Sequence, residues 1–532
     1  MKKKYFVPLT ATLALGCMGL LGGLPVVHAD AIPPTTTQDL TSLGTISTSV
    51  TGLSDLTFAK AERKYQLHPI TDLLAWTGFC HQGGRDITVQ FADPVDVQHI
   101  QITMEQDPSQ GIYYPNHVQF EVYENGQWIS LETQDTSIST SNSSKTTEVF
   151  QFDSSTGVET SQIRLNFPVN VFVFARGLDV TGSTTETGTV PTSPVVSPAS
   201  SGSTSFGALA PNSPNAHGIK NMLMVPTGSY GPLGTWFTGD FEPMLEYINS
   251  TGQAVGPLFD TMLFAPFANV QNTVDSWNAY LDDLFANGQE LSALNDAVGM
   301  TNQSLNRPGY QEKVILSIPY FPYGMWNFGM VNGQPLNFIG TPADPNAVEA
   351  RNTAMTWYVD TVLSRWQSAN YQNLQLVGLY WNHEQYSFNK PGEQQMFQDA
   401  ETLAHNHGLP LLWIPYYSAP GGTQWQSLGL DAAWIQPNYI EQGENADVNR
   451  IRNAETLAKS HGMGVEIELT GLDAPTRSLY QTFLNQLSTD GFDSGNVSYA
   501  FYDGSKLLLD AEQSGDPSQR SIYDETAAFI MH

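Results

Sequence analysis

The sequence predicts an α/β protein in which a (β/α)8 TIM-like barrel follows an antiparallel β-sandwich. Three observations predict this architecture. In the C-terminal part, short apolar runs alternate with amphipathic stretches of helical period. In the N-terminal part, apolar and polar residues alternate with a period of two, as in strands with one buried face. A tract rich in Thr, Ser, Pro and Gly separates the two parts.

The N-terminus has the parts of a secretory signal peptide. It begins with a basic stretch, continues with apolar residues 8–24, and reaches Val27-His28-Ala29, which has the small-residue spacing of a cleavage site. We therefore expect residues 1–29 to be removed and the mature protein to be secreted. Lipid attachment at Cys17 is the alternative, but the preceding Ala14-Leu15-Gly16 is a poor lipid-attachment box.

The net charge limits the kinds of partner that the protein can bind, and the cysteine content limits the disulfides that it can form. The net charge of −30 argues against binding to nucleic acid or anionic membranes. No stretch after the signal peptide is long and apolar enough to span a membrane. Once Cys17 is removed, only Cys80 remains, so no internal disulfide is expected. Aromatic residues make up 11% of the chain, a composition typical of secreted proteins that stack on sugars and also of an ordinary aromatic-rich core.

Strand patterns dominate residues 53–182. Alternating stretches lie at 86–91, 97–104, 117–123 and 162–167, and Asn125-Gly126 supplies a hairpin turn. Short alternating strands without a helix of any length predict an antiparallel sandwich. The preceding residues 30–52 are rich in Thr and Ser, and we expect them to be disordered.

The order of these strands resembles the galactose-binding-like, discoidin-type jelly rolls, through Ile87-Thr-Val-Gln-Phe91, the stretch 118–128 and Ile163-Arg-Leu165. In that superfamily the loops at one end often bind carbohydrate. The resemblance therefore implies a carbohydrate-binding module. A spacer that packs on the next domain fits the pattern equally well.

Residues 183–214 cannot bury enough apolar surface to order themselves, so we expect an interdomain linker. Residues 215–532 then carry eight strand candidates, at 220–226, 259–264, 313–319, 374–381, 410–415, 432–436, 464–469 and 497–502. Amphipathic stretches between them lie at 274–291, 347–367, 393–407, 447–461 and 477–487. This eightfold alternation predicts the barrel. An open doubly wound sheet is the alternative, but Thr227-Gly-Ser-Tyr-Gly-Pro is not the glycine-rich phosphate loop that usually follows its first strand.

Most barrel strands end in aromatic or polar side chains. Because the C-terminal ends of barrel strands meet at one face, these side chains predict a cleft lined by rings and amides. Sugars need such a lining, since their C–H faces stack on rings and their hydroxyl groups need donors and acceptors. The expected substrate-binding residues are Tyr320, Trp381, Asn382, His383, Trp413, Tyr416, Gln436, Asn438, Tyr439, Glu466, Tyr502 and Asp503.

Two carboxylates in this set predict chemistry. Glu384 follows the fourth strand and Glu468 ends the seventh, and we expect them to face each other across the barrel mouth. A carboxyl pair that straddles one glycosidic bond hydrolyses it, with retention at a separation of about 5 Å and inversion at about 6.5–9.5 Å. Glu466 lies one strand period from Glu468 on the same face. We choose Glu384 as the acid because Trp381 would give it apolar surroundings.

The positions of this pair resemble those in the large retaining clan of barrel glycosidases, which places its acid/base and nucleophile on the same two strands. That clan usually has Asn directly before the acid/base, whereas here His383 intervenes and Asn382 lies two residues back. Two further aspartates, Asp240 and Asp260, lie near strand ends and are candidate contacts for substrate hydroxyl groups.

Metal and serine chemistry find little support. His405 and His407 are two apart on a helix and cannot face one metal ion, and His383 beside Glu384 lacks a visible third ligand. No Gly-x-Ser-x-Gly elbow occurs, so a serine hydrolase is not supported. We expect no metal and no cofactor.

Several motifs of the C-terminal part together resemble the bacterial family catalogued as domain of unknown function 4855. They are Leu376-Val-Gly-Leu-Tyr-Trp-x-x-Glu384, Trp413-Ile-Pro-Tyr416, Gly429-x-Asp431, Gln436-Pro-Asn-Tyr439 and Gly462-Met-Gly-x-Glu-Ile-Glu468, with Gln106-Asp-Pro-Ser-Gln-Gly-Ile-Tyr-Tyr-Pro115 upstream. The resemblance implies a secreted or surface protein with a glycosidase-like barrel. We expect a monomeric glycoside hydrolase acting on a polysaccharide or cell-wall glycan, or alternatively a non-catalytic carbohydrate-binding or adhesion protein.

Overall fold

The computed structural model describes residues 37–531 except 82–83, 138–143, 170, 186–187, 190–206, 229–234, 267–269, 323, 340–344, 387–391 and 505. The expected signal peptide, Cys17 and the central part of the expected linker lie outside the described residues. Within them, none of the helices has the length and apolar character needed to cross a membrane.

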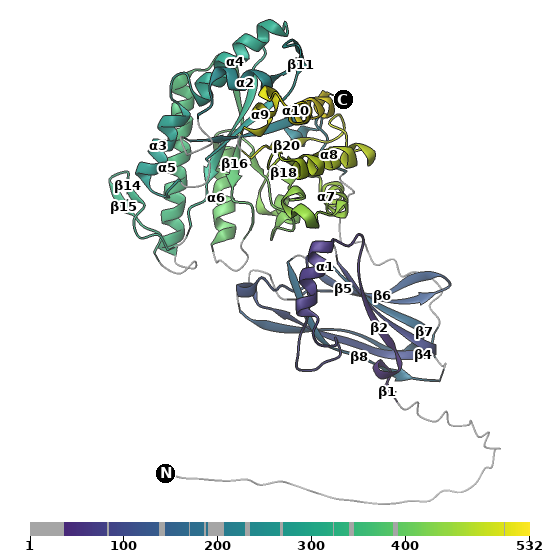
Figure 1. Ribbon diagram of the computed structural model, residues 1–532. Helices are drawn as coiled ribbons and strands as arrows, with labels where there is room; N and C mark the ends of the chain where they lie inside the picture. Colours follow the sequence, from purple (N-terminus) through teal and green to yellow (C-terminus); the bar gives the residue numbers. More distant parts are fainter. Residues whose placement is uncertain are drawn as a thin grey trace, which may run out of the picture.

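The N-terminal part is an antiparallel sheet of eight strands around its own core (Figure 1). The strands are β1 (Gln38–Asp39), β2 (Thr45–Val50), β3 (Thr77–Cys80), β4 (Arg85–Gln106), β5 (His117–Glu124), β6 (Gln127–Asp135), β7 (Thr146–Phe167) and β8 (Phe172–Ser183). The main path runs β1-β8-β4-β7-β5-β6, while β2 pairs with β4 and β3 with β8. The expected antiparallel β-sandwich is confirmed. Irregularities in the pairing of β4 with β7 let these 22-residue strands bend around the core.

Part of the segment expected to be disordered is ordered. β2 pairs with β4 from Thr45↔Gln90 to Val50↔Arg85, and the side chain of Leu40 is fully buried. The expectation for residues 30–52 is therefore wrong over Gln38–Val50, while residues 30–36 lie outside the described residues. The strand was missed because most of its side chains face solvent, so the sequence lacks a run of buried apolar residues.

The C-terminal part is a closed parallel barrel, so the open doubly wound sheet is excluded. In order around the ring its strands are β12 (Thr261–Pro266), β13 (Glu312–Pro319), β16 (Leu374–Asn382), β17 (Leu411–Trp413), β18 (Ala432–Ile435), β19 (Gly464–Glu468), β20 (Tyr499–Tyr502) and β9 (Asn221–Thr227). All eight expected strands are confirmed, with ends that differ by a few residues. Two short hairpins, β10–β11 (Glu246–Ile248 and Ala254–Pro257) and β14–β15 (Gly329–Val331 and Gln334–Leu336), lie outside the ring.

Helices surround the barrel (Figure 1). They are α2 (Thr238–Leu245), α3 (Val274–Leu284), α4 (Glu290–Ser304), α5 (Pro345–Ala369), α6 (Glu393–Asn406), α7 (Val448–His461), α8 (Ala474–Thr489), α9 (Leu507–Gln513) and α10 (Pro517–Met531). The stretch expected to be helical at 274–291 spans two helices. The segment that separates α3 from α4 contains Gly288, whose positive φ of 73° does not fit a continuous helix.

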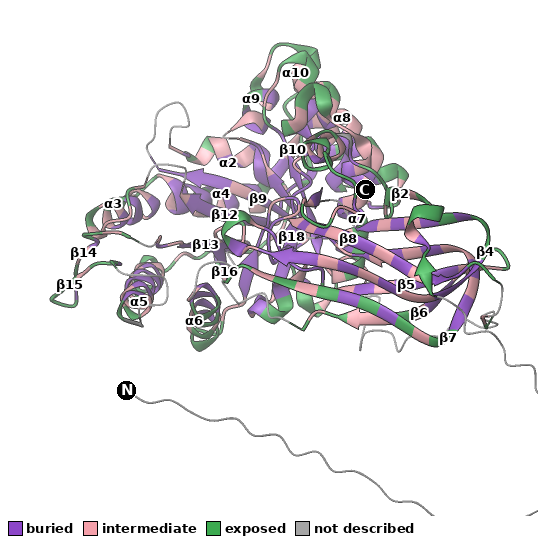
Figure 2. Cartoon of the chain, turned by 90° about the horizontal axis from the view of Figure 1, so that it is seen from below, coloured by how far each residue is buried: buried purple, intermediate pink, exposed green. Residues whose placement is uncertain are grey.

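The alternation of strand side chains divides the barrel into an inner and an outer layer. Tyr380 of β16 and Trp434 of β18 belong to the cluster inside the ring, whereas Trp381 and Trp413 belong to the cluster shared with the helices. Figure 2 shows the barrel strands buried over most of their length. Because direction alternates along each strand, the residue that ends a strand points either into the mouth or toward the helices.

Candidate active site

A cavity of about 500 Å³ opens at the C-terminal ends of the barrel strands. Its lining combines carboxylates, amides and tyrosines with one arginine. The lining residues are Thr57, Phe58, Met224, Glu384, Tyr416, Tyr417, Gln436, Asn438, Glu441, Gln442, Arg450, Glu466, Glu468 and Tyr502. A smaller cavity of about 290 Å³ shares Glu384 and Tyr416 with it and adds Asn382, His383 and Gln385.

Glu468 is the most firmly held carboxylate of this cavity. It ends β19, is 2% exposed, and accepts hydrogen bonds from Asn438 Nδ2 at 2.8 Å and from the Tyr439 backbone N–H at 3.2 Å. Burial raises its pKa to about 8, and the charge of Glu441 adds to the effect, while the two N–H donors and Arg450 oppose it. The bonds fix the carboxyl group in one orientation at the strand end.

Glu466 lies two residues earlier on β19 and faces the same cavity. It is 3% exposed. Burial raises its pKa well above the usual range, and the charges of Glu468 and Glu384 raise it further. Burial and the neighbouring carboxyl groups therefore favour the protonated form of Glu466.

Glu384 reaches the cavity from β16, three strands away from β19 around the ring. It follows β16 by two residues, lines both cavities, and is exposed to solvent as a whole. The pKa of its carboxyl group is nevertheless raised, mainly because surrounding protein atoms keep water away from it and also because Glu441 is negatively charged. A hydrogen bond with Gln436 opposes this shift. The cavity thus holds carboxyl groups from the fourth and seventh strands together.

Glu441 was not found from the sequence. It lies on a short 3-10 helix (Ile440–Asn445) after β18 and lines the cavity. Its charge is among the causes that raise the pKa of Glu384, Glu466 and Glu468. Since it follows the Gln436–Tyr439 motif in a loop without periodicity, no sequence signal placed it at the site.

Several expected sugar-binding residues do line a cavity. Gln436 donates from Nε2 to the Ile414 carbonyl at 3.1 Å, and its Oε1 accepts from Asn438 Nδ2 at 3.0 Å. Tyr416 donates to Gln385 Oε1 at 3.1 Å. Tyr502 at the end of β20 has its pKa raised to about 12 by burial and by Glu466. These amides and hydroxyl groups remain candidate contacts for substrate hydroxyl groups.

Three expected stacking residues are corrected because they point to the helices. Trp381 and Trp413 are 0% exposed and pack on Phe397 of α6, with ring centroids 5.1 and 5.8 Å away. Tyr439 is 2% exposed and contacts Phe483 of α8 edge to face. The period of two explains these positions, since Trp381 lies three residues from the inward-facing Glu384. None of these rings lines the two cavities, and Trp381 does not supply the apolar surroundings expected for Glu384.

Tyr320 and Asp503 are corrected as well. The Tyr320 hydroxyl donates to Glu393 Oε1 at 2.8 Å, and its ring stacks on His383 at 3.9 Å. Asp503 accepts from the Leu508 backbone N–H at the start of α9. It adjoins Tyr502, so it points to the other side of the strand.

The two further aspartates also lie elsewhere. Asp260 precedes β12 and accepts from the backbone N–H groups of Lys220 and Asn221, at the ends of the strands opposite the cavity. Asp240 pairs with Lys506. In the part of the chain that the structure describes, no group of three His, Cys, Asp or Glu side chains could hold a metal ion.

A family model described as "Domain of unknown function (DUF4855)" matches residues 221–528, which include every barrel strand. The resemblance seen in the motifs is confirmed. Comparison with curated proteins gives no match.

Three of the solved structures that are similar to parts of this chain are the following. The CBM22-1–GH10 modules of xylanase 10B from Clostridium thermocellum, complexed with xylohexaose, are 8% identical over 84% of this chain and 90% of theirs, with a TM-score of 0.34. The family 32 CBM of NanJ from Clostridium perfringens, in complex with galactose, is 12% identical over 27% and 98%, with a TM-score of 0.18. A fucolectin from striped bass (Morone saxatilis) serum is 15% identical over 27% and 49%, with a TM-score of 0.19.

Proposed function

This chain belongs to the family described as "Domain of unknown function (DUF4855)", and since that description names no activity, we propose from the site itself that the protein is a glycoside hydrolase. Its substrate would be a polysaccharide or cell-wall glycan, and its signal-peptide pattern supports action outside the cell. The single observation that carries the proposal is that Glu384 and Glu468, from strands four and seven, line one cavity together with amide and hydroxyl groups.

Glu468 suits the role of the anionic partner. Asn438 Nδ2 and the Tyr439 N–H are donors only, so they stabilise the carboxylate form and oppose the burial that raises the pKa of Glu468 to about 8. The active form of the pair would be the one in which Glu468 has lost its proton and Glu384 keeps one. The Glu468 carboxylate would face the anomeric carbon as positive charge develops there. Burial raises the pKa of Glu466 beside it and so favours its neutral form, which limits the negative charge on the same strand.

Glu384 suits the role of the general acid. Its raised pKa favours the protonated form, and its position at the cavity mouth lets it donate a proton to the departing sugar oxygen. Once the glycosidic C–O bond has broken, water can enter from the open side, its oxygen bonds to the anomeric carbon, and it loses a proton to the same carboxylate. Each turnover leaves Glu384 protonated again, so the proton balance closes.

A screen of polysaccharides with analysis of the released sugars tests this function. We expect the wild-type protein to release oligosaccharides from at least one of cellulose, xylan, mannan, chitin, galactan or peptidoglycan, and the Glu384→Gln variant to release none. Binding to one of these glycans that survives Glu384→Gln and Glu468→Gln, without any sugar release from wild type, would contradict hydrolysis and assign a carbohydrate-binding or adhesion role.

The Glu441→Gln variant tests the electrostatics of the pair. Activity needs one proton on the Glu384–Glu468 pair, and the charge of Glu441 raises the pKa of both members. Removing that charge should lower both values, so both limbs of the kcat/KM profile should move to lower pH. Glu444→Gln, a change on the same 3-10 helix at an exposed residue outside the cavity, should leave the profile in place. A shift of the Glu441→Gln profile to higher pH would contradict the arrangement.

A further inference from the structure

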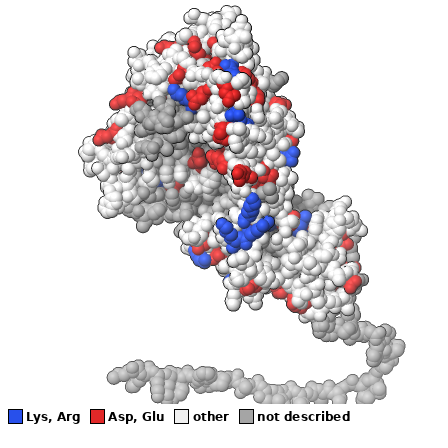
Figure 3. Space-filling model, viewed as in Figure 1, with Lys and Arg blue, Asp and Glu red and all other residues white. Residues whose placement is uncertain are grey.

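One wall of the cavity comes from the sandwich and not from the barrel. Thr57 and Phe58 line the cavity, and both belong to α1 (Leu56–Glu62), a short helix that precedes β3. Figure 1 shows α1 on the side of the sheet that faces the barrel. In Figure 3 basic side chains gather over this helix, close to acidic side chains of the barrel. The cavity therefore lies where the two parts meet.

Hydrogen bonds attach this segment to the barrel loop after β18 and to α7. Asn449 Nδ2 donates to the Ser54 carbonyl at 3.0 Å, and Asn453 Nδ2 donates to the Leu53 carbonyl at 3.1 Å. Lys60 Nζ donates to Asn445 Oδ1 at 2.7 Å. These bonds hold the start of α1 in one position over the barrel mouth.

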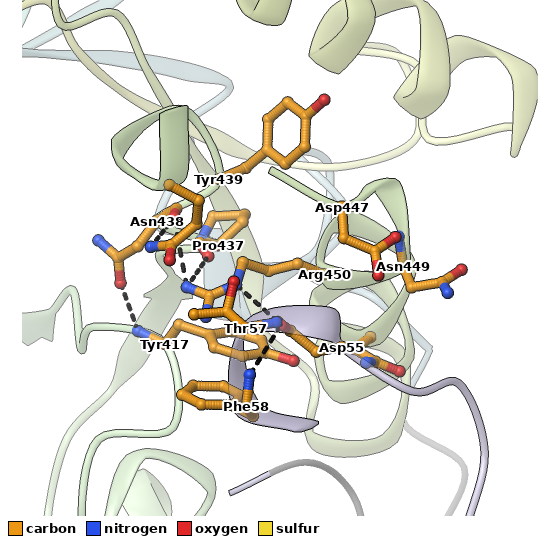
Figure 4. A network of polar contacts seen from close by, with 12 residues as sticks. Asp55, Thr57, Phe58, Tyr417, Pro437, Asn438, Tyr439, Asp447, Asn449 and Arg450 are labelled. Atoms are coloured by element: carbon orange, nitrogen blue, oxygen red, sulfur yellow. Dashed lines mark hydrogen bonds and ion pairs between the residues drawn. The ribbon is translucent and has the colours of Figure 1, made fainter. Parts of the chain in front are cut away.

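The centre of this contact is a buried ion pair. Arg450 Nε of α7 donates to Asp55 Oδ2 at 2.8 Å, and the two side chains are 4% and 0% exposed. Asp55 is also the N-cap of α1, since its Oδ1 accepts from the backbone N–H groups of Thr57 and Phe58. One carboxylate thus caps the helix and neutralises the arginine (Figure 4).

Aromatic rings complete the setting of Arg450. Its guanidinium carbon lies 4.7 Å from the Phe58 ring centroid and 4.5 Å from that of Tyr417. The Phe58 ring is parallel to Tyr417 at 5.6 Å and stacks on His81 at 4.4 Å. Phe58 thus packs against Arg450, Tyr417 and His81 where it bounds the cavity.

Arg450 in turn holds the backbone that carries the groups around Glu468. Its Nη1 donates to the carbonyl oxygens of Pro437 at 3.4 Å and Asn438 at 3.3 Å. Asn438, which has a positive φ of 47°, donates from Nδ2 to Glu468, and the next residue donates its backbone N–H to the same carboxylate. A continuous series of contacts therefore leads from Asp55 through Arg450 to Glu468.

We propose that Asp55 is a positioning residue of the active site, which holds Arg450 on the Pro437–Asn438 carbonyls and thereby fixes the donors of Glu468. The inference deepens the proposed function and rests on it. Its consequence is that the barrel alone lacks a complete site. The sandwich then has a role in turnover, in addition to any role in glycan binding.

Asp55→Asn is the sharpest test, because asparagine keeps the N-cap of α1 and its shape but removes the charge that holds Arg450. On the polysaccharide identified in the screen, we expect kcat to fall roughly 100-fold with KM changed less than about threefold, as for a misplaced catalytic group. Asp516→Asn also alters an aspartate that accepts a backbone N–H at the start of a helix, but Asp516 directly precedes α10 and does not line the cavity, so this change should have no effect.

Two further measurements separate positioning from loss of fold and from failure of the proposed function. In an Arg450→Gln background, Asp55→Asn should cause no further loss of kcat, because it acts only through Arg450. Hydrogen exchange of the Tyr439 amide, which needs no substrate, should be faster in Asp55→Asn than in wild type. If wild type is active while Asp55→Asn keeps its kcat and its Tyr439 protection, the inference is overturned and the function stands. If wild type cleaves no glycan, the proposed hydrolase function is rejected. The positioning role of Asp55 is then tested only by whether the Tyr439 amide exchanges faster in Asp55→Asn than in wild type.

Discussion

Replacing Glu468 by Gln should lower kcat at least about 1,000-fold, and Glu384→Gln should have a loss of similar size, because each variant removes a carboxyl group with its own chemical step. The measurement is the initial rate of reducing-sugar release on the substrate identified by the screen. Glu132→Gln, the same change at an exposed position of β6, should keep full activity. A Glu468→Gln variant with more than a tenth of the wild-type rate would remove this residue from the mechanism.

The stability of Glu468→Gln should depend on pH in a direction set by the raised pKa. Between the ordinary value of 4.5 and about 8, folded Glu468 keeps a proton that the unfolded chain releases. Its contribution to the free energy of unfolding therefore falls as pH rises through this window. Gln has no such dependence, but it presents only one acceptor to the two N–H donors and loses a hydrogen bond. The melting temperature of the variant should lie below wild type at pH 5, and the difference should shrink or reverse by pH 9.

The architecture could be predicted because its signals are local. Buried parallel strands read as continuous apolar runs, and β13, β16 and β19 each follow an amphipathic helix or precede one. Glu384 and Glu468 could be singled out for the same reason, since they lie at the ends of such runs. The site carboxylates lie at strand ends, where the sequence changes abruptly from apolar to polar, and this change makes them visible in the sequence.

The direction of side chains at the strand ends was predicted less well, although the sequence contained part of the information. Once Glu384 is placed inward, the period of two turns Trp381 outward, and an inward Tyr502 turns Asp503 outward. The contribution of Asp55 had no local signal at all. Its partner Arg450 lies 395 residues away, and the pair exists only because the sandwich packs on the barrel.

Packing inside the barrel explains why Gly464, in the motif Gly462-Met-Gly-x-Glu-Ile-Glu468, has to be a glycine. Gly464 begins β19 beside Trp434, which lies fully buried inside the ring and donates from Nε1 to Ser498 Oγ at 3.1 Å. A Cβ atom at Gly464 would lie 2.1 Å from Trp434 Cδ1 and 2.5 Å from the Ser498 carbonyl oxygen. The carbonyl belongs to the backbone leading into β20, so it cannot rotate away.

Gly464→Ala should therefore destabilise the protein more than an ordinary added methyl group, which costs about 1–3 kcal/mol in a packed core. We expect a loss of about 3 kcal/mol or more, seen as a drop of roughly 10 °C in melting temperature. Gly378→Ala in β16 is the matched control, because the nearest atom to its Cβ would be the flexible end of Leu412 at 3.0 Å, and its other neighbours, Leu412 Cγ and Pro410 Cγ, are also side-chain atoms at 3.4 and 3.5 Å. It should lower the melting temperature by a few degrees at most. A Gly464→Ala protein that melts within about 2 °C of wild type would contradict this packing of Trp434, and with it the position from which β19 projects Glu466 and Glu468 into the cavity.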